Sequence, residues 1–108
     1  MSKYRNVPCE LDGEKYRSKK EMARHAQLKL LQRAKQISEL QREVPFVLAD
    51  AVHIGGRKRP ALRYFADFVY LDANGARVVE DAKGMRTEGY RIKRHLMATI
   101  HQIEILET

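Results

Sequence analysis

The sequence predicts an α/β protein in which two helices flank a mixed central sheet. The expected order is helix, strand, strand, strand, helix, strand (αβββαβ), with a β-hairpin in front. Three observations support this prediction. A chain of 108 residues with 44% hydrophobic content can build one core and no second domain, so residues 1–108 are expected to form a single domain. Two stretches have helical periodicity, and the segments between and after them alternate between apolar and polar residues.

The first elements are a hairpin and a helix. In "VPCELDGEKYR" two short alternating runs flank Asp12-Gly13, a dipeptide that favours a tight hairpin turn. Residues 19–36 are expected to form an amphipathic helix, and Ser18 with Glu21 at its start has the spacing of a capping box. The apolar residues that recur at helical spacing, and therefore form the expected buried face, are Met22, Ala26, Leu30, Ala34 and Ile37.

Three strands are expected next, at 44–52, 62–71 and 76–83. Between the first two lies "HIGGRKRP", which predicts a glycine-rich basic loop that holds Arg57, Lys58 and Arg59. The segment "DANG" predicts a turn between the second and third strands, so these two form a hairpin.

A second helix is expected over 88–100, capped by Thr87, and "QIEILE" predicts a last strand after it. Its apolar face would carry Ile92, Leu96 and Ile100. The other face is basic, with Arg91, Lys93 and Arg94, which would allow the helix to contact phosphates while it packs on the sheet. The alternative is an ordinary solvated helix face.

The charge of the chain indicates a polyanionic partner. Lys and Arg number 21 against 14 Asp and Glu, for a formal net charge of +7, and nucleic acid is the leading candidate. A basic protein without such a partner is the alternative. The one cysteine cannot form an internal disulfide, and no apolar run resembles a membrane span or a signal peptide, so we expect a cytoplasmic protein that does not contact membranes.

The segment "VVEDAKG" raises the question of catalysis, because a strand-like run ends in Glu80, Asp81 and Lys83. A two-residue Asn74-Gly75 turn would place Asp67 of the preceding strand opposite Ala82, with the two aspartates on opposite faces. A three-residue loop 73–75, with Gly75 at positive φ, would instead place Asp67 opposite Asp81. Lys83 would then share their face and Glu80 would point away.

Carboxylates that converge in this way repel each other unless a cation lies between them, and oxygen ligands favour Mg²⁺ or Mn²⁺. An ammonium group nearby would stabilise the charge that develops on a phosphate as it is cleaved. The three-residue loop therefore predicts phosphodiester hydrolysis by Asp67, Asp81 and Lys83. Ordinary ion pairs at the end of a hairpin are the alternative.

The pattern "D67…E80-D81-A82-K83-G84" in an αβββαβ order resembles the PD-(D/E)xK nuclease superfamily, which includes Holliday junction resolvases. More closely, "SKKEMARHAQLKLLQRAKQISELQ", "GRKRPALRYFADFVYLDANG" and "VVEDAKGMRTEGYRIKRHLM" resemble a family of small phage- and prophage-encoded proteins of formerly unknown function that is grouped with the endodeoxyribonucleases. The resemblance extends from about Val7 onward and implies a restriction-endonuclease-like core. One departure is that Ala66, and not proline, precedes Asp67.

The resemblance also implies roles for single residues. Asp67 and Asp81 would bind the metal, with the main-chain carbonyl of Ala82, and Lys83 would be the catalytic lysine. Glu21 corresponds to the first-helix glutamate of resolvase-like members and would be a further metal or water ligand. The DNA-binding residues would be the cations of the loop and of the region around the second helix, namely Arg57, Lys58, Arg59, Arg86, Arg91, Lys93 and Arg94.

Three functions agree with this pattern. The favoured one is a divalent-metal-dependent endodeoxyribonuclease of phage origin that acts on duplex or branched DNA. If it is a resolvase, we expect a homodimer, because two symmetric strands must be cut. The others are a non-catalytic DNA-binding module, for which a misplaced Glu21 or Asp67 would be the sign, and an interaction protein for an acidic partner, which predicts no divalent-metal binding.

Overall fold

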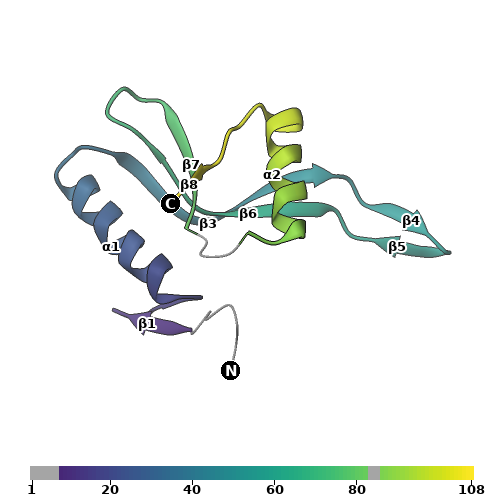
Figure 1. Ribbon diagram of the computed structural model, residues 1–108, viewed down its shortest axis with the longest axis horizontal. Helices are drawn as coiled ribbons and strands as arrows, with labels where there is room; N and C mark the ends of the chain where they lie inside the picture. The colour runs from purple at the N-terminus through teal and green to yellow at the C-terminus, as the bar shows by residue number, and fades with distance from the viewer. Residues whose placement is uncertain (1–7, 83–85) are drawn as a thin grey trace.

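The computed structural model of the chain describes residues 8–82 and 86–108 (Figure 1). Its main sheet has four strands in the order β3-β6-β7-β8, antiparallel except for the parallel pair β7 and β8. The elements are β1 (Cys9–Leu11), β2 (Glu14–Tyr16), α1 (Lys19–Arg33), β3 (Ser38–Ala49), β4 (Val52–Ile54), β5 (Arg57–Arg59), β6 (Leu62–Leu71), β7 (Arg77–Asp81), α2 (Glu88–His101) and β8 (Leu106–Glu107). The predicted mixed sheet with two helices is confirmed, and so is the N-terminal hairpin β1–β2 around Asp12-Gly13.

Each helix covers its own hydrophobic cluster. The cluster beneath α1 contains Leu28, Phe68 and Tyr70, whereas that beneath α2 contains Val69 and Met97 among others. Because Phe68 and Val69 are neighbours on one strand and their side chains alternate, the two clusters lie on opposite faces of the sheet. The sheet is therefore covered by one helix on each side, as the sequence predicts.

The face that α1 buries differs from the prediction. Leu30 is 60% exposed and Ala26 is exposed, while Glu21, His25 and Leu28 are buried. These three recur at the same helical spacing, but two of them are polar, so a search for apolar periodicity misses them. The helix also ends at Arg33 and not at residue 36.

The apolar face predicted for α2 is confirmed only at Leu96. Ile92 is 53% exposed and Ile100 is 44% exposed, and only Leu96 packs partly against the core. The buried residues are Tyr90 and Met97. The predicted cap is confirmed, since Thr87 Oγ1 accepts a hydrogen bond of 3.1 Å from the amide of Tyr90.

The turn between β6 and β7 is the three-residue loop. Asp72 pairs with Ala76 through a backbone hydrogen bond of 2.8 Å, and the amide of Gly75 donates to the carbonyl of Asp72 at 2.9 Å. Gly75 has a φ of 81°, a conformation that glycine adopts without the steric cost other residues incur. The loop is therefore 73–75, which sets the register on which the acidic site depends.

The predicted basic loop after β3 is a second hairpin. Strands β4 and β5 pair through Val52–Arg59, His53–Lys58 and Ile54–Arg57, with Gly55 and Gly56 at positive φ in the turn. The sequence does not reveal these strands, because three residues each are too few to show a pattern. We call residues 52–59 the arm, since they extend from the end of β3 and β6 away from both helices (Figure 1).

Candidate acidic site at the ends of β6 and β7

Asp67 and Asp81 lie opposite each other on adjacent strands. The register pairs Phe68 with Glu80, and one further step in the same register brings Asp67 to Asp81. Side chains of directly opposite residues share a face of the sheet, so both carboxylates lie on one side and Glu80 on the other. This confirms the arrangement expected for a three-residue loop and excludes the two-residue alternative.

Glu21 joins the site from the first turn of α1. Ser18 caps the helix, with its Oγ accepting from the amide of Glu21 at 3.2 Å. The reciprocal bond of the expected capping box goes elsewhere: the Glu21 carboxylate accepts from the amide of Arg17 at 3.1 Å and lies 3.5 Å from Nη2 of Arg42. These contacts hold the carboxylate towards the sheet, where it lies beside Asp67.

The contact between Glu21 and Asp67 changes the acidity of the site. Burial raises the pKa of Glu21, and the neighbouring Asp67 carboxylate raises it further, against the lowering effect of the Arg17 amide. Both residues are 3% exposed. Two carboxylates held together with so little solvent are costly when both are ionised, so the pair favours a shared proton or a cation between them.

The two carboxylate oxygens of Asp67 differ in their hydrogen bonding. Its Oδ2 accepts a hydrogen bond of 2.7 Å from the amide of Ala82, while its Oδ1 is buried and receives no hydrogen bond from any residue in the described part of the chain. A buried carboxylate oxygen without a donor is costly in a folded protein and is the kind of atom that a metal ion would ligate. Ala82 is thus placed at the site by its amide, whereas ligation by its carbonyl stays a prediction.

Asp81 is positioned by a tyrosine that sequence analysis missed. The hydroxyl of Tyr64 donates to Oδ2 of Asp81 at 2.6 Å, and both residues are buried. Burial raises the pKa of Tyr64 well above its usual range, and the bond to Asp81 raises it further, so the phenol stays a donor. The only sequence signal was a tyrosine on the same strand as Asp67, which is too common to carry a prediction.

Glu21 and Asp67 are in contact and Asp81 lies opposite Asp67, but the three acids do not form a complete metal centre. Within residues 8–82 and 86–108, no group of three or more Asp, Glu, His or Cys side chains is close enough to hold a metal ion. Glu21 and Asp67 could bind a divalent cation as two adjacent oxygen ligands. Asp81 lies on the same face of the sheet as Asp67. The predicted Lys83 lies outside the described residues.

A buried ion pair fixes α1 to the sheet beside this site. Nε and Nη2 of Arg24 lie 2.5 and 3.0 Å from the two oxygens of Glu80, which is fully buried. The hydroxyls of Tyr70 and Thr108 also donate to Glu80, at 2.5 and 3.1 Å. Burial and this carboxylate raise the pKa of Tyr70 to about 12. Arg24 and Glu80 therefore connect the helix that carries Glu21 to the strand that carries Asp81.

The cations predicted to bind DNA divide into two groups. Arg57, Lys58 and Arg59 are exposed on the arm. Around α2 the charges are partly neutralised within the chain: Glu107 lies 3.4 Å from Arg86 and 3.1 Å from Arg94. This arrangement corrects the expectation that all the basic residues near the second helix are available to phosphates.

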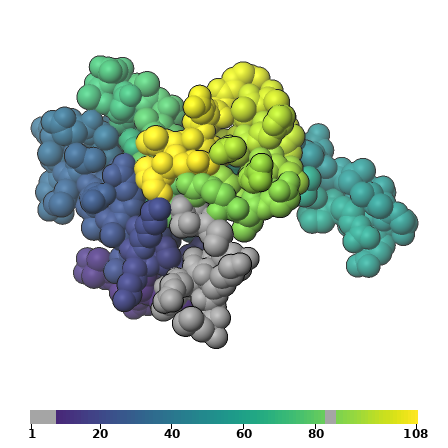
Figure 2. Space-filling view, viewed as in Figure 1, coloured from purple at the N-terminus to yellow at the C-terminus, as the bar shows by residue number. Residues whose placement is uncertain are grey.

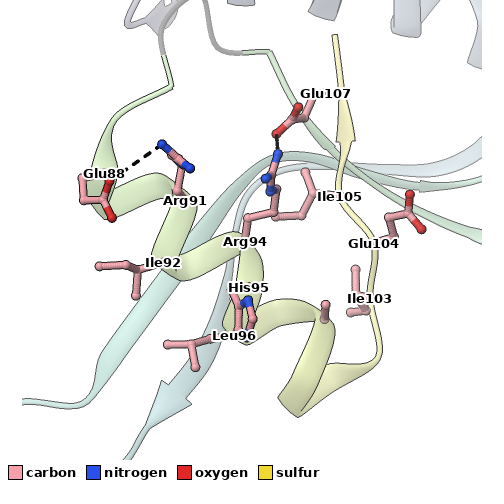
Figure 3. A pocket seen from close by; sticks show the side chains of 11 residues that line it. Glu88, Arg91, Ile92, Arg94, His95, Leu96, Ile103, Glu104, Ile105 and Glu107 are labelled. Atoms are coloured by element: carbon pink, nitrogen blue, oxygen red, sulfur yellow. Dashed lines mark hydrogen bonds and ion pairs between the residues drawn. The ribbon is translucent and has the colours of Figure 1, made fainter.

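Arg91 lies 3.9 Å from Glu88, and Lys93 is half-buried. Figure 3 shows the Glu88–Arg91 and Arg94–Glu107 pairs at a hollow between α2 and the segment that leads into β8. None of the three acids of the candidate site lines this hollow. Its mixed charges and exposed isoleucine do not match the chemistry expected of the predicted site.

The fold and site define a mixed α/β protein with a buried carboxyl pair at the ends of two central strands. The family described as "Protein of unknown function (DUF1064)" matches residues 1–105, so the chain belongs to this family. Neither the curated proteins nor the solved structures contain a match to the chain. In the part that the structure describes, no helix is long and apolar enough to cross a membrane.

Proposed function

We propose that the protein is a divalent-metal-dependent endodeoxyribonuclease built on the restriction-endonuclease-like core of the PD-(D/E)xK superfamily. The observation that carries this proposal is the buried contact between Glu21 and Asp67, opposite Asp81, with one oxygen of Asp67 lacking a donor among the described residues. The order α1, β3, β6, β7, α2, β8 of the main elements supports it, because the superfamily has the same αβββαβ order.

Glu21, Asp67 and Asp81 would hold Mg²⁺ or Mn²⁺, with the carbonyl of Ala82 as a further ligand. Bound there, the cation would polarise the phosphodiester and lower the pKa of an attacking water. Oxygen donors of this kind select hard cations. A cation would also offset the repulsion between the carboxylates of Glu21 and Asp67, and this gain would favour its binding.

Other residues keep these acids in place. The Ala82 amide orients Asp67, and the Tyr64 hydroxyl orients Asp81 while remaining protonated. The Arg17 amide orients Glu21. Lys83, two positions beyond Asp81, would stabilise negative charge on the phosphate during cleavage, as the superfamily motif implies.

The two alternatives predict different properties. A non-catalytic module on the same fold would be indicated by a displaced Glu21 or Asp67, and the contact between these two residues favours the nuclease instead. An interaction protein for an acidic partner is expected not to bind a divalent cation at this site. Branched DNA as substrate and a homodimer remain part of the proposal.

The test is cleavage of labelled four-way junction, flap and linear duplex DNA with Mg²⁺ or Mn²⁺. We expect the wild type to cut and Asp67→Asn and Asp81→Asn to lose at least about 100-fold in rate, since each removes a charged oxygen ligand of the proposed cation. Asp72→Asn is the matched control. Asp72 accepts two backbone hydrogen bonds of 2.9 Å in the turn, and an asparagine oxygen can keep them. DNA binding without cleavage in either metal would overturn the nuclease and leave a binding module.

A further inference from the structure

The arm is a slender basic projection that none of the described elements covers. All residues of 52–59 are exposed, including Val52 and Ile54 at 49% and 57%. Figure 1 shows β4 and β5 continuing the direction of β3 and β6 beyond α2, and Figure 2 shows the arm standing clear of the rest of the surface at the right of the view. The two glycines of its turn would meet no atom within 4 Å if they carried a Cβ, so there is open space beside the turn.

The charge of this region is of one sign. Residues 51–66 contain Arg57, Lys58, Arg59 and Arg63 and no Asp or Glu. Across residues 8–82 and 86–108, no salt bridge engages Arg57, Lys58 or Arg59, in contrast to the arginines that share Glu107. Because cations without acidic neighbours attract phosphates most strongly, the arm is complementary to a polyanion.

The pairing of the two strands sorts these cations onto faces. Arg57 and Arg59 alternate with Lys58, so they share one face of the ribbon with Val52 and Ile54. Lys58 lies on the other face with its partner His53. Two arginines two positions apart on one face form a pair of donors suited to phosphate oxygens or to the acceptor edge of guanine.

An exposed strip of β3 and β6 continues from the arm towards the acidic site and ends at Phe65. On β3 and β6, Val47 pairs with Arg63, and both are exposed. Phe65, the next residue on that face, is 42% exposed and is followed two positions later by Asp67. The opposite face of the same strands carries buried residues such as Phe46 and Tyr64, which pack beneath α2. A ligand held by the arm can therefore continue along this exposed strip as far as Phe65, two residues before the buried Asp67.

We propose that the arm enters the major groove of B-form duplex DNA, with the Arg57 and Arg59 face directed at the DNA, and so makes duplex DNA the substrate class. The strands of a ribbon are about 4.8 Å apart, and the major groove, about 12 Å wide, admits two strands with their side chains. The major groove of A-form RNA is deep and narrow and excludes such a ribbon. The location of cleavage rests on the proposed function, whereas duplex binding by the arm does not.

The test separates binding from cleavage. Binding of the full chain to a 20-base-pair DNA duplex, the RNA duplex of the same sequence and single-stranded DNA would be measured in EDTA over a range of salt concentrations. The variant is Arg57→Gln/Arg59→Gln. The matched control is Arg33→Gln/Lys35→Gln, which removes the same charge at the C-terminal end of α1 and just after it. Cleavage would be measured separately with Mg²⁺.

We expect DNA duplex to bind more tightly than the other two ligands. The arm variant should lose at least about tenfold in duplex affinity and reduce the slope of log K against log salt by about two, while the control stays within about twofold of wild type. Equal losses in both variants, or equal binding of RNA and DNA duplexes, would overturn the proposal. Wild-type affinity in the arm variant would overturn it even if the protein cuts DNA. Arm-dependent duplex binding without cleavage would support it and refute the nuclease instead.

Discussion

Replacing Arg24 with methionine is expected to destabilise the protein and to disturb the candidate site together. Arg24 forms two hydrogen bonds, of 2.5 and 3.0 Å, with the fully buried carboxylate of Glu80. It lies one helical turn after Glu21, and Glu80 precedes Asp81 directly. Because this pair is a buried charged contact between α1 and β7, its loss should let the helix shift relative to the strand that carries Asp81.

The size of the effect follows from the burial of the pair. Breaking a fully buried ion pair costs about 3 to 5 kcal/mol, because one charge remains without its partner. The Arg24 side chain is 25% exposed, and the hydroxyls of Tyr70 and Thr108 still donate to Glu80. We therefore expect Arg24→Met, which keeps the apolar stem, to lower the free energy of unfolding by about 2 to 3 kcal/mol.

The assay is urea unfolding followed by circular dichroism for Arg24→Met, Glu80→Met and the double variant. The double variant should lose much less than the sum of the single losses, with a coupling energy of about 2 kcal/mol, since two methionines leave no buried charge. Single losses that add to within about 0.5 kcal/mol would refute the reasoning. Cleavage by Arg24→Met should fall even under conditions in which the variant is fully folded.

Three further predictions concern single positions. Because the folded pKa of Glu21 is raised, its contribution to the stability of the metal-free protein is fully present below the unfolded pKa and is lost as pH rises through the folded pKa. In EDTA, the urea midpoint of the wild type should therefore fall relative to that of Glu21→Gln as the pH rises from 4 to 8. Parallel plots of midpoint against pH for the two proteins would contradict this. Tyr64→Phe removes the hydroxyl that Asp81 accepts from, so it should cost about 1 to 3 kcal/mol in urea unfolding and slow cleavage at saturating metal; unchanged stability and rate would show that the bond has no role. Gly75→Ala should cost about 1 kcal/mol because Gly75 has a φ of 81°. Gly89→Ala should instead add about 0.5 to 1 kcal/mol, because Gly89 lies in α2 and an added Cβ would meet the Thr87 hydroxyl oxygen at 4.0 Å, an ordinary contact distance. Equal thermal shifts for the two alanine variants would argue against the turn geometry.

Local patterns in the sequence were sufficient for several elements. Asp12-Gly13 predicted the first hairpin, Thr87 predicted the start of α2, and Ala73-Asn74-Gly75 offered a loop that would bring Asp67 opposite Asp81. Turns and caps depend on the backbone preferences of a few adjacent residues, so they can be read without knowledge of the rest of the chain.

The faces of the helices could not be predicted in that way. The apolar residues of α1 at helical spacing are largely exposed, and the buried positions include Glu21 and His25. The hydroxyl of Tyr16 lies 2.7 Å from Nδ1 of His25, and the imidazole ring of His25 stacks on Phe68. These two partners, which allow His25 to be buried, come from β2 and β6. A polar side chain is buried only where distant residues supply its hydrogen bonds, so its burial is not encoded in the helix alone.

The sequence by itself determined the order of the main elements, the net positive charge and two registers consistent with the turn before β7. Tertiary structure decided which register forms, brought Glu21 from α1 to Asp67, and placed Tyr64 on Asp81. It also separated the cations of the arm, which no salt bridge engages within the described part of the chain, from those that Glu107 engages. The physical reason is the range of the interactions: turn and strand preferences act between neighbours in the chain, whereas burial and the contacts of charged groups depend on residues that only the fold brings together.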